Sequence, residues 1–298
     1  MPTNRLAKLL FVTIAACLVF ACSKPEHAEV TVKAPAGGDT LPALAHDHQA
    51  AAQVKIESAN RVSKLMEVSG FNDQILQLQS GVLASADQSL AADLADRYAV
   101  LDILSKAFTP ALLQAEARRH IERELPAADI DAALVWLQSD TGQTITALEM
   151  QYANAEAQQA AAEAFRDLSK NTERLQFVRR LDDEIGGTAS SVDVMLSVQN
   201  SMKQALNAKA ENGAELAVLS EQQLAEQAAL LVDQFQPLVE ASYLYNYRSL
   251  TVEQLQSYVD FAATEPARRY HKVLADSTKH AMSAAASNAG LAIADMAR

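Results

Sequence analysis

The chain has 298 residues, a formal net charge of −12 and 49% apolar residues. The acidity argues against nucleic acid or an anionic membrane surface as the main partner, and the apolar fraction is enough for a sizeable core. The two cysteines, Cys17 and Cys22, both lie near the amino terminus, which excludes a disulfide framework and thiol chemistry in the rest of the chain.

Residues 1–21 have the layout of an export signal. A short basic start precedes the apolar run Leu9 to Ala21, which is shorter than the roughly 20 apolar residues that a membrane-spanning helix needs. The segment Leu18-Val19-Phe20-Ala21-Cys22 resembles the lipobox of bacterial lipoproteins, in which the signal is removed before a cysteine that is then acylated. The resemblance implies lipidation of Cys22. Ser23 after it implies the periplasmic face of the outer membrane.

Two alternatives to this anchor stay open. The segment could be an ordinary secretory signal with Cys22 incidental, or cleavage could occur at Cys17, because Ile14-Ala15-Ala16-Cys17 is a second lipobox-like segment. Cys22 is preferred, since cleavage before Cys17 would leave Leu-Val-Phe-Ala exposed on the mature protein. All of these alternatives place the rest of the chain outside the cytoplasm.

Residues 22–55 predict a flexible tether behind the acylated cysteine. They contain prolines and a Gly-Gly pair without any sustained period, and a coil of this length spans on the order of 30 Å. The triplet His46-Asp47-His48 offers two metal ligands, but no third ligand is near. A solvated polar patch is the preferred interpretation, and no metal site or cofactor is predicted.

The remaining chain predicts an all-α fold made of two tandem helical repeats, residues 56–170 and 171–298, packed as helix–turn–helix units. Caps, prolines, glycines and apolar periodicity mark the expected helices. Tyr98 and Leu112 are expected to face inward. The expected helices are 58–68, 72–85, 90–108, one from Pro110, 127–138 and 141–168 in the first repeat, and 172–185, 190–201, 222–235, 237–248, 251–263 and one from 265 in the second.

The repeat is clearest between Leu125–Glu149 and Leu250–Leu274, which align without a gap at a spacing of 125. Both segments carry an apolar stripe with the spacing of a buried helix face. We therefore expect Leu134 and Val259 to be buried on equivalent helices. The aligned stripes are Ile130, Ala133, Leu134 and Leu137 in the first segment and Leu255, Tyr258, Val259 and Ala262 in the second.

Each segment is interrupted by a helix stop and restart. Thr251 and Gln254 form a predicted capping box, and Ser139 and Thr264 are positioned to cap the helices that follow the two breaks. This structural role accounts for both breaks without any ligand.

These features resemble a family of bacterial periplasmic proteins known only as domain of unknown function twenty fifty-nine. The family shows a Leu-Thr/Pro-x-x-Glu/Asp-Leu helix and then a Ser-Pro-x-Gly-like break. Here Ser139-Asp140-Thr141-Gly142 lacks the proline, and Thr264-Glu265-Pro266-Ala267 lacks the glycine. The resemblance covers most of residues 60–298 as two copies. It implies an exported helical protein and carries no catalytic residues.

Five tyrosines cluster in the second repeat and form the first candidate site: Tyr243, Tyr245, Tyr247, Tyr258 and Tyr270. They could line a pocket for an amphipathic ligand, although core packing explains most aromatic stripes on helices and is the preferred interpretation. Tyr245 is expected to point away from Tyr243 and Tyr247, which lie two residues before and after it on the same helix. It is therefore the strongest candidate of the group for contact with a ligand or partner.

Charged clusters offer weaker candidates. Arg268 and Arg269 near a helix start could bind an anion, but offsetting the acidic surface, with Arg269 paired to Glu265, is preferred. The acidic run 182–184 is expected to pair with Arg179 and Arg180 rather than with a cation. No catalytic motif occurs, and the histidines at 120, 271 and 280 are expected to be isolated surface residues, so no enzyme is predicted.

Three hypotheses for function follow. The preferred one is a non-enzymatic interaction module, anchored in the outer membrane, that binds a protein of the cell envelope. The alternative is a carrier that holds a small apolar or amphipathic ligand between helices near the tyrosines, and an envelope hydrolase is the weakest. An exposed apolar patch would favour the module, and a cavity beside Tyr243 and Tyr247 would favour the carrier.

The lipid anchor gives the first testable prediction. Replacing Cys22 with Ala should abolish fatty-acid labelling and move the protein from the membrane fraction to the soluble fraction, because one thiol carries the acyl groups. Unchanged labelling of the Cys22→Ala protein would contradict the lipoprotein hypothesis. Labelling that depends on Cys17 instead would move the cleavage site without changing the compartment.

Overall fold

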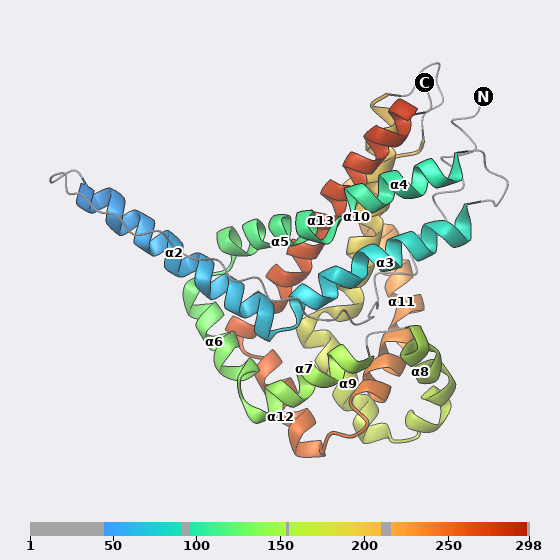
Figure 1. The fold of residues 1–298 in the computed structure, drawn as a ribbon. Helices are drawn as coiled ribbons and strands as arrows, with labels where there is room; N and C mark the ends of the chain where they lie inside the picture. The colour runs from blue at the N-terminus through green and yellow to red at the C-terminus, as the bar shows by residue number, and fades with distance from the viewer. Residues whose placement is uncertain (1–44, 91–95, 153–154, 210–215, 297–298) are drawn as a thin grey trace.

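The computed structural model describes residues 45–90, 96–152, 155–209 and 216–296, and these residues are helical with no strand (Figure 1). The all-α prediction is therefore confirmed. The helices are α2 (Ala45–Val68), α3 (Phe71–Ser89), α4 (Arg97–Ala107), α5 (Pro110–Glu124), α6 (Ala127–Leu137), α7 (Asp140–Tyr152), α8 (Ala155–Leu168), α9 (Thr172–Ile185), α10 (Gly187–Asn207), α11 (Glu221–Asn246), α12 (Val252–Ala262) and α13 (Glu265–Met296).

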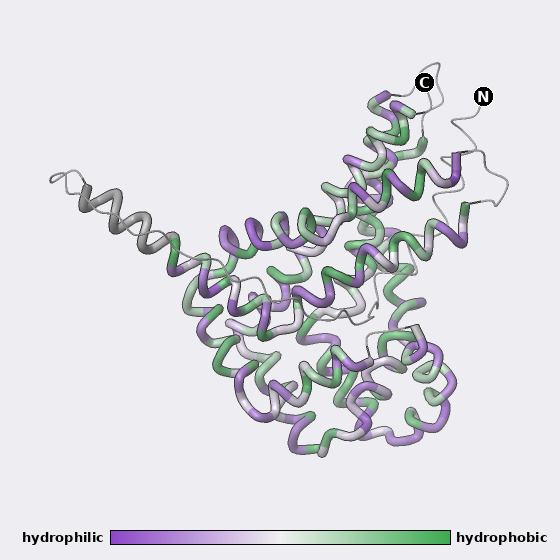
Figure 2. The backbone as a smooth tube through the Cα atoms, viewed as in Figure 1, coloured by the Kyte–Doolittle hydropathy of each residue, from purple (hydrophilic) through white to green (hydrophobic). Residues whose placement is uncertain are grey.

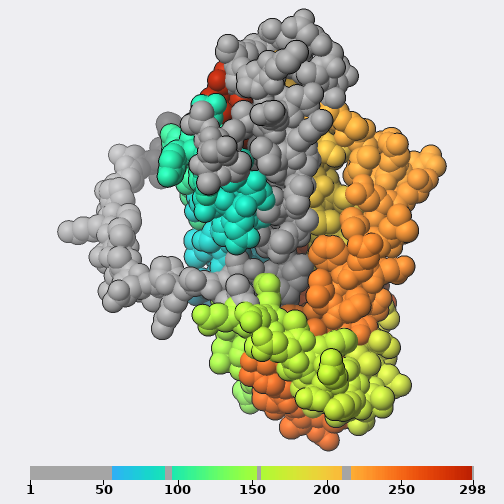
Figure 3. Space-filling model, turned by 90° about the vertical axis from the view of Figure 1, so that its right-hand side faces the viewer, coloured from blue at the N-terminus to red at the C-terminus, as the bar shows by residue number. Residues whose placement is uncertain are grey.

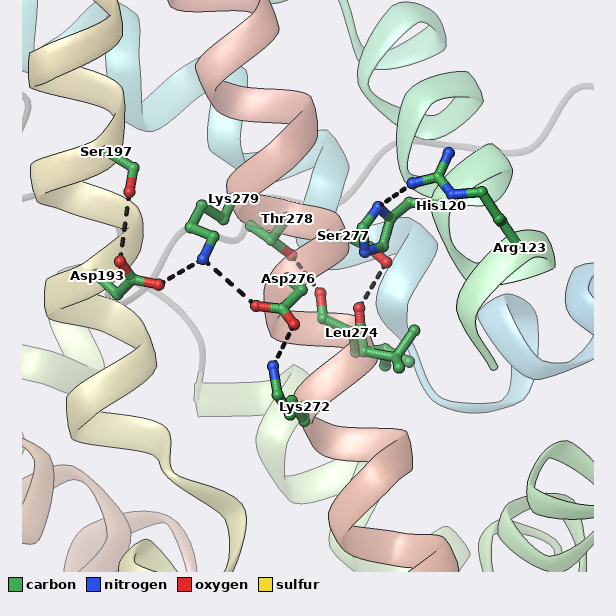
Figure 4. Close-up of polar contacts among 11 residues, drawn as sticks. His120, Arg123, Asp193, Ser197, Lys272, Leu274, Asp276, Ser277, Thr278 and Lys279 are labelled. Carbon is green, nitrogen blue, oxygen red and sulfur yellow. Dashed lines mark hydrogen bonds and ion pairs between the residues drawn. The ribbon is translucent and has the colours of Figure 1, made fainter. Parts of the chain in front are cut away.

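Helix α13 is the centre of the packing. It lies along α10 and also contacts α4, α5 and α6, whereas α11 contacts α8, α9 and α10 (Figure 1). Polar contacts tie α13 to α10 at their surface. In Figure 4, Lys279 lies between Asp193 of α10, at 2.8 Å, and Asp276 of its own helix, which also accepts a 2.6 Å hydrogen bond from Lys272.

The buried apolar side chains form one large core and two smaller ones. The large core contains side chains from helices α2 through α6 and from α10 and α13. Its fully buried members include Leu65, Leu104 and Met282. The second core lies among α7, α9, the end of α11 and α12, and the third lies between α10 and α11. Because the large core draws on both predicted repeats, residues 56–170 and 171–298 do not pack as two separate bundles.

The two predicted breaks have the same local structure. Each bound of α12 lies 125 residues after the matching bound of α6, and α13 begins 125 residues after α7. Ser139 and Thr264 each accept a hydrogen bond from the backbone amide three residues later and donate one to the carbonyl three residues earlier. The capping box of Thr251 and Gln254 also forms, so the predicted caps are confirmed.

Two glycines make a second pair of matching corners. Gly70, between α2 and α3, has a φ of 72°, and Gly186, between α9 and α10, has a φ of 67°. Glycine adopts this left-handed conformation at little cost, so at both corners the chain turns directly into the next helix. The corners lie 116 residues apart.

The two predicted repeats exchange contacts through their last helices. Helix α7 packs on α11 and α12 of the second repeat, while α13 packs on α4, α5 and α6 of the first. The exchange continues along α8, which lies on α11; Figure 3 shows their residues side by side at the surface. The tandem duplication itself stays a prediction. The contact of α7 with α12 nevertheless corresponds to the contact of α13 with α6, since each joins the last part of one repeat to the equivalent helix of the other.

The predicted apolar register is correct except at one position. Ile130, Ala133 and Leu137 are buried in the first segment, as are all four stripe residues of the second, including Val259. Leu134 is only half-buried at the edge of the large core, so the prediction that it is buried was wrong. Tyr98 and Leu112 are 83% and 55% exposed, so their predicted inward orientation was also wrong.

Several helix boundaries differ from the prediction: α3 ends at Ser89 rather than at residue 85, α4 begins at Arg97 rather than at residue 90, and α10 extends beyond the expected range 190–201 at both ends. Helix α2 begins at Ala45, inside the expected tether, because the alanine-rich sequence after Pro42 favours a helix. The expected helix 141–168 corresponds to two helices, α7 and α8, and residues 153–154 between them lie outside the described residues. The expected helices 222–235 and 237–248 form one helix, α11, with Pro237 inside it, because packing on α8, α9 and α10 outweighs the local cost of proline.

Polar and apolar residues alternate along the helices (Figure 2). Within the described residues, none of the helices combines the length and apolar character that crossing a bilayer requires.

An ion pair between the half-exposed Arg269 and the buried Asp129 fixes α13 against α6. The carboxylate of Asp129, only 5% exposed, accepts two hydrogen bonds from Arg269, at 2.6 and 3.0 Å. This pairing lowers the pKa of Asp129 below its usual value. We expect Arg269→Met to lower the free energy of unfolding by about 2–3 kcal/mol, because it leaves a buried carboxylate without its partner.

The control for this prediction is Arg268→Met. Arg268 pairs with Glu184 from a half-exposed position, so its loss should cost less than about 1 kcal/mol in the same urea melts. Equal losses for the two variants would contradict the structural role of the Asp129 pair.

Candidate functional site

A cavity of about 340 Å³ lies between the large core and the second core. Helices α3, α6, α7, α9, α10, α11, α12 and α13 supply its walls. The polar lining residues are Ser69, Gln74, Gln77, Thr146, Glu149, Ser190, Ser191, Tyr243, Asn246, Tyr247, Tyr258, Tyr270, His271 and Thr278.

Residues that match between the predicted repeats line the same cavity. Gly70 and Gly186 set the spacing of 116 for one group of pairs, and the two breaks set the spacing of 125 for the other. The lining pairs at a spacing of 116 are Ser69 and Ile185, Gln74 and Ser190, Ile75 and Ser191, and Leu78 and Val194; those at 125 are Trp136 and Phe261, Ile145 and Tyr270, Thr146 and His271, and Glu149 and Leu274. The cavity therefore lies where the two halves of the chain meet.

Stacked aromatic rings form one wall of the cavity. Trp136 stacks on Phe261 at 4.7 Å between ring centroids and on Tyr258 at 6.1 Å. Tyr247 meets Tyr258 edge-on at 6.0 Å and Tyr243 at 5.7 Å. The rings come from α6, α11 and α12, so contacts between the two halves of the chain hold the wall in place.

Glu149 of α7 is the one acidic side chain among the described residues that line the cavity. Its Oε1 atom accepts hydrogen bonds from the hydroxyls of Tyr247, at 2.6 Å, and Tyr258, at 3.1 Å. Burial raises the pKa of Glu149 above its usual value, and the two hydrogen bonds oppose this shift. Among the described lining residues there is no lysine or arginine to balance a carboxylate here.

The end of α11 positions the tyrosines beside Glu149. Arg174 of α9 donates to the carbonyls of Tyr247 and Leu250, at 2.5 and 3.0 Å, and so fixes the turn into α12. Gly187 leaves room for Tyr243, since a Cβ there would lie 2.3 Å from the tyrosine hydroxyl oxygen. Burial raises the pKa values of Tyr243, Tyr247 and Tyr258, so their hydroxyls stay protonated hydrogen-bond donors.

His271 lies on the same wall, in the first turns of α13. Its Nε2 atom is buried and has no hydrogen-bond partner within the described chain. Its ring lies 4.7 Å from Tyr270 and 6.2 Å from Phe261. Burial lowers the pKa of His271 to about 4, so the ring is neutral at pH 7. The expectation of an isolated surface histidine was therefore wrong.

The predicted contact residues fall into different environments. Tyr243 and Tyr247 line the cavity, whereas Tyr245 lies outside it, packed edge-on against Tyr152 at 5.5 Å and covered by the guanidinium of Arg248. Arg268 and Arg269 are engaged in ion pairs with acidic side chains and do not line the cavity. The predicted pair of Arg269 with Glu265 forms. Cys22 lies outside the described residues.

The acidic run 182–184 is bonded differently from the prediction. Arg179 pairs with the buried Glu240 of α11, and Glu184 pairs with Arg268 of α13. Asp182 accepts hydrogen bonds from the backbone and hydroxyl of Thr188 and so closes the corner at Gly186. The predicted ion pairs were wrong: Arg179 and Glu184 pair with neighbouring helices instead, and the guanidinium of Arg180 lies over the ring of Phe177, 4.6 Å from its centroid.

Sequence reasoning missed Glu149, although a signal was present. Gly142, Ile145 and Glu149 lie on one face of α7, and the first two are buried. A single carboxylate that continues an apolar helix face is a candidate functional group. His271 and Tyr270 could not be placed in this way, because only α13 crossing to the first repeat brings them to Glu149.

Within the described residues, no group of three or more His, Cys, Asp and Glu residues is arranged to hold a metal ion. Comparison of the chain with family models, curated proteins and solved structures finds no match. The resemblance to the domain family described above stays a prediction.

The neutral, buried His271 makes stability depend on pH. Its pKa is lowered in the folded protein, so unfolding takes up a proton below the usual pKa of 6.5, and stability falls as the pH drops toward 4. From pH 7 to pH 5 this group should remove about 2 kcal/mol from the free energy of unfolding. Glu149, with its raised pKa, contributes with the opposite sign.

The measurement is urea unfolding of the native protein and a His271→Phe variant at both pH values. The variant should lose less stability on acidification, because only the histidine contribution is removed. Val135→Phe, which introduces the same ring at a position that is 75% exposed, is the control and should behave like the native protein. An unchanged pH dependence in the His271→Phe protein would show that His271 is accessible to protons in the folded state.

Proposed function

We propose that this protein is a non-enzymatic binding protein that holds a small amphipathic ligand in the cavity between its two halves. The observation that carries the proposal is the lining: aromatic and aliphatic walls with the polar groups Glu149 and His271 converging on one space. Such a combination is typical of small-molecule sites, and a volume of about 340 Å³ lies within their usual range.

Unsatisfied polar groups support a ligand rather than simple core packing. A buried ring nitrogen without a partner costs free energy, and native cores rarely keep one. The Nε2 atom of His271 is such a group, and it belongs to a cavity-lining side chain. A ligand that bonds to it would remove this cost.

The interaction-module hypothesis has less support. The large exposed apolar side chains of the described residues are distributed over α2, α3, α4, α5, α6, α11 and the segment before α11. None of these helices carries more than two of them. The cavity beside Tyr243 and Tyr247 is the feature that favours a carrier, and the proposed lipid anchor at Cys22 would hold this carrier at the periplasmic face of the outer membrane.

Trp136 provides the test of ligand binding, because it is the only tryptophan of the chain and lies on the cavity wall. Titration with the neutral lipophilic dye N-phenyl-1-naphthylamine should change the fluorescence of Trp136 in a saturable way. A Thr146→Phe variant, which fills the cavity from α7, should weaken dye binding at least about tenfold.

Thr144→Phe is the matched control. Thr144 is exposed on the same helix, so this substitution adds the same ring outside the cavity and should leave dye binding unchanged. Equal loss of binding in both variants, or dye binding without any change in Trp136 fluorescence, would place the dye elsewhere and overturn the proposal.

A further inference from the structure

The geometry points to a small organic cation, an amine or a quaternary ammonium group with an apolar tail, as the ligand class of this cavity. The inference rests on the proposed binding function and adds the chemistry of the ligand to it. Glu149 would supply the negative charge, and the aromatic wall would surround the cationic group.

The hydrogen bonds of Glu149 involve only one of its two carboxyl oxygens. Both tyrosine hydroxyls donate to Oε1, and within the described residues Oε2 accepts no hydrogen bond. Since the described lining contains no lysine or arginine, an ionised Glu149 in the empty cavity would lack a counter-ion. A buried carboxylate in this position is either protonated or balanced by a bound cation.

The rings around Glu149 match a cation as well. Trp136, Phe261, Tyr258 and Tyr247 form a connected group on the wall beside the carboxyl group. The face of an aromatic ring attracts a cation, most strongly where water is excluded, and several rings beside a carboxylate are a recurrent arrangement around ammonium groups. A primary, secondary or tertiary ammonium group could form one further hydrogen bond with Nε2 of His271, whereas a quaternary group, which has no N–H, would bind through charge and the rings alone.

Other ligand charges fit less well. An anion would meet Glu149 with no basic side chain among the described lining residues to receive it. A neutral apolar molecule would leave Oε2 of Glu149 and Nε2 of His271 without partners, at a cost in free energy for each group. A cation with an apolar tail satisfies the carboxylate and the apolar walls together.

The titratable groups around Glu149 define how binding should depend on pH. Tyr247 and Tyr243 face it from α11, Tyr258 from α12, and Tyr270 and His271 from α13, while Asp182 of α9 lies near Tyr243. The tyrosines stay neutral because burial raises their pKa values. Acidification should therefore weaken cation binding, first as Glu149 takes up a proton and then as His271 becomes positively charged.

The experiment measures displacement of N-phenyl-1-naphthylamine from the full chain by three competitors of similar size: hexyltrimethylammonium, 1-nonanol and nonanoate. We expect the cation to bind at least about tenfold more tightly than the alcohol, and the carboxylate to bind most weakly. The advantage of the cation over the alcohol should shrink from pH 8 to pH 5, whereas binding of the alcohol should change little.

Glu149→Gln tests the role of the carboxylate. It keeps the size of the side chain and a carbonyl acceptor for the tyrosine hydroxyls but removes the charge, so the cation should lose its tenfold advantage while the alcohol binds as before. Glu253→Gln changes the net charge equally at an exposed position of α12 and should leave the preference intact. Circular dichroism and urea melts of both variants verify that they are folded.

The outcomes separate the two proposals. If the dye binds in the cavity but the alcohol or nonanoate competes as well as the cation, the cationic ligand class is wrong and the binding function stands. The same conclusion follows if Glu149→Gln keeps the preference for the cation. If the dye fails the Trp136 test, both proposals are wrong.

Discussion

The stop and restart of the chain at Ser139 and again at Thr264 is the constraint on which the rest of the structure depends. At both places one hydroxyl satisfies the backbone of the helix that ends and of the helix that begins, so the turn needs almost no loop. The helices that follow, α7 and α13, are therefore directed into the opposite half of the chain. They carry Glu149 and His271, so the same constraint brings both groups to the cavity.

Much of the fold could be predicted from the sequence, because local chemistry determines it. Caps, prolines and the glycines at 70 and 186 marked most helix ends, and apolar spacing identified the buried faces of α6 and α12. The predictions failed where tertiary packing overrides local preference. Pro237 lies inside α11 because three neighbouring helices hold that helix together, and Leu134 lies at the edge of its core rather than within it.

The candidate site was only half predictable for the same reason. The tyrosines at 243 and 247 were identified by their spacing on one helix face, which is a local property. Tyr258 also belonged to the predicted cluster, whereas Glu149 and His271 come from two further helices and reach the tyrosines only because the two halves of the chain exchange contacts. Local spacing also favoured Tyr245 as a contact residue, yet its ring lies against Tyr152 and Arg248 outside the cavity.

The polar groups buried in the cavity wall lower the stability of the fold. Burial opposes the charge on Glu149 and on His271, and removal of either group in favour of an apolar side chain would relieve that opposition. The surrounding residues do the reverse: two hydroxyls point at the carboxyl group, and Arg174 holds the turn that places one of them. In the binding function that we propose, a ligand that neutralises Glu149 would bind only the folded protein and would stabilise it with the logarithm of its concentration. Ligand binding and the stability of the joint between the two halves would then be linked through the same carboxyl group.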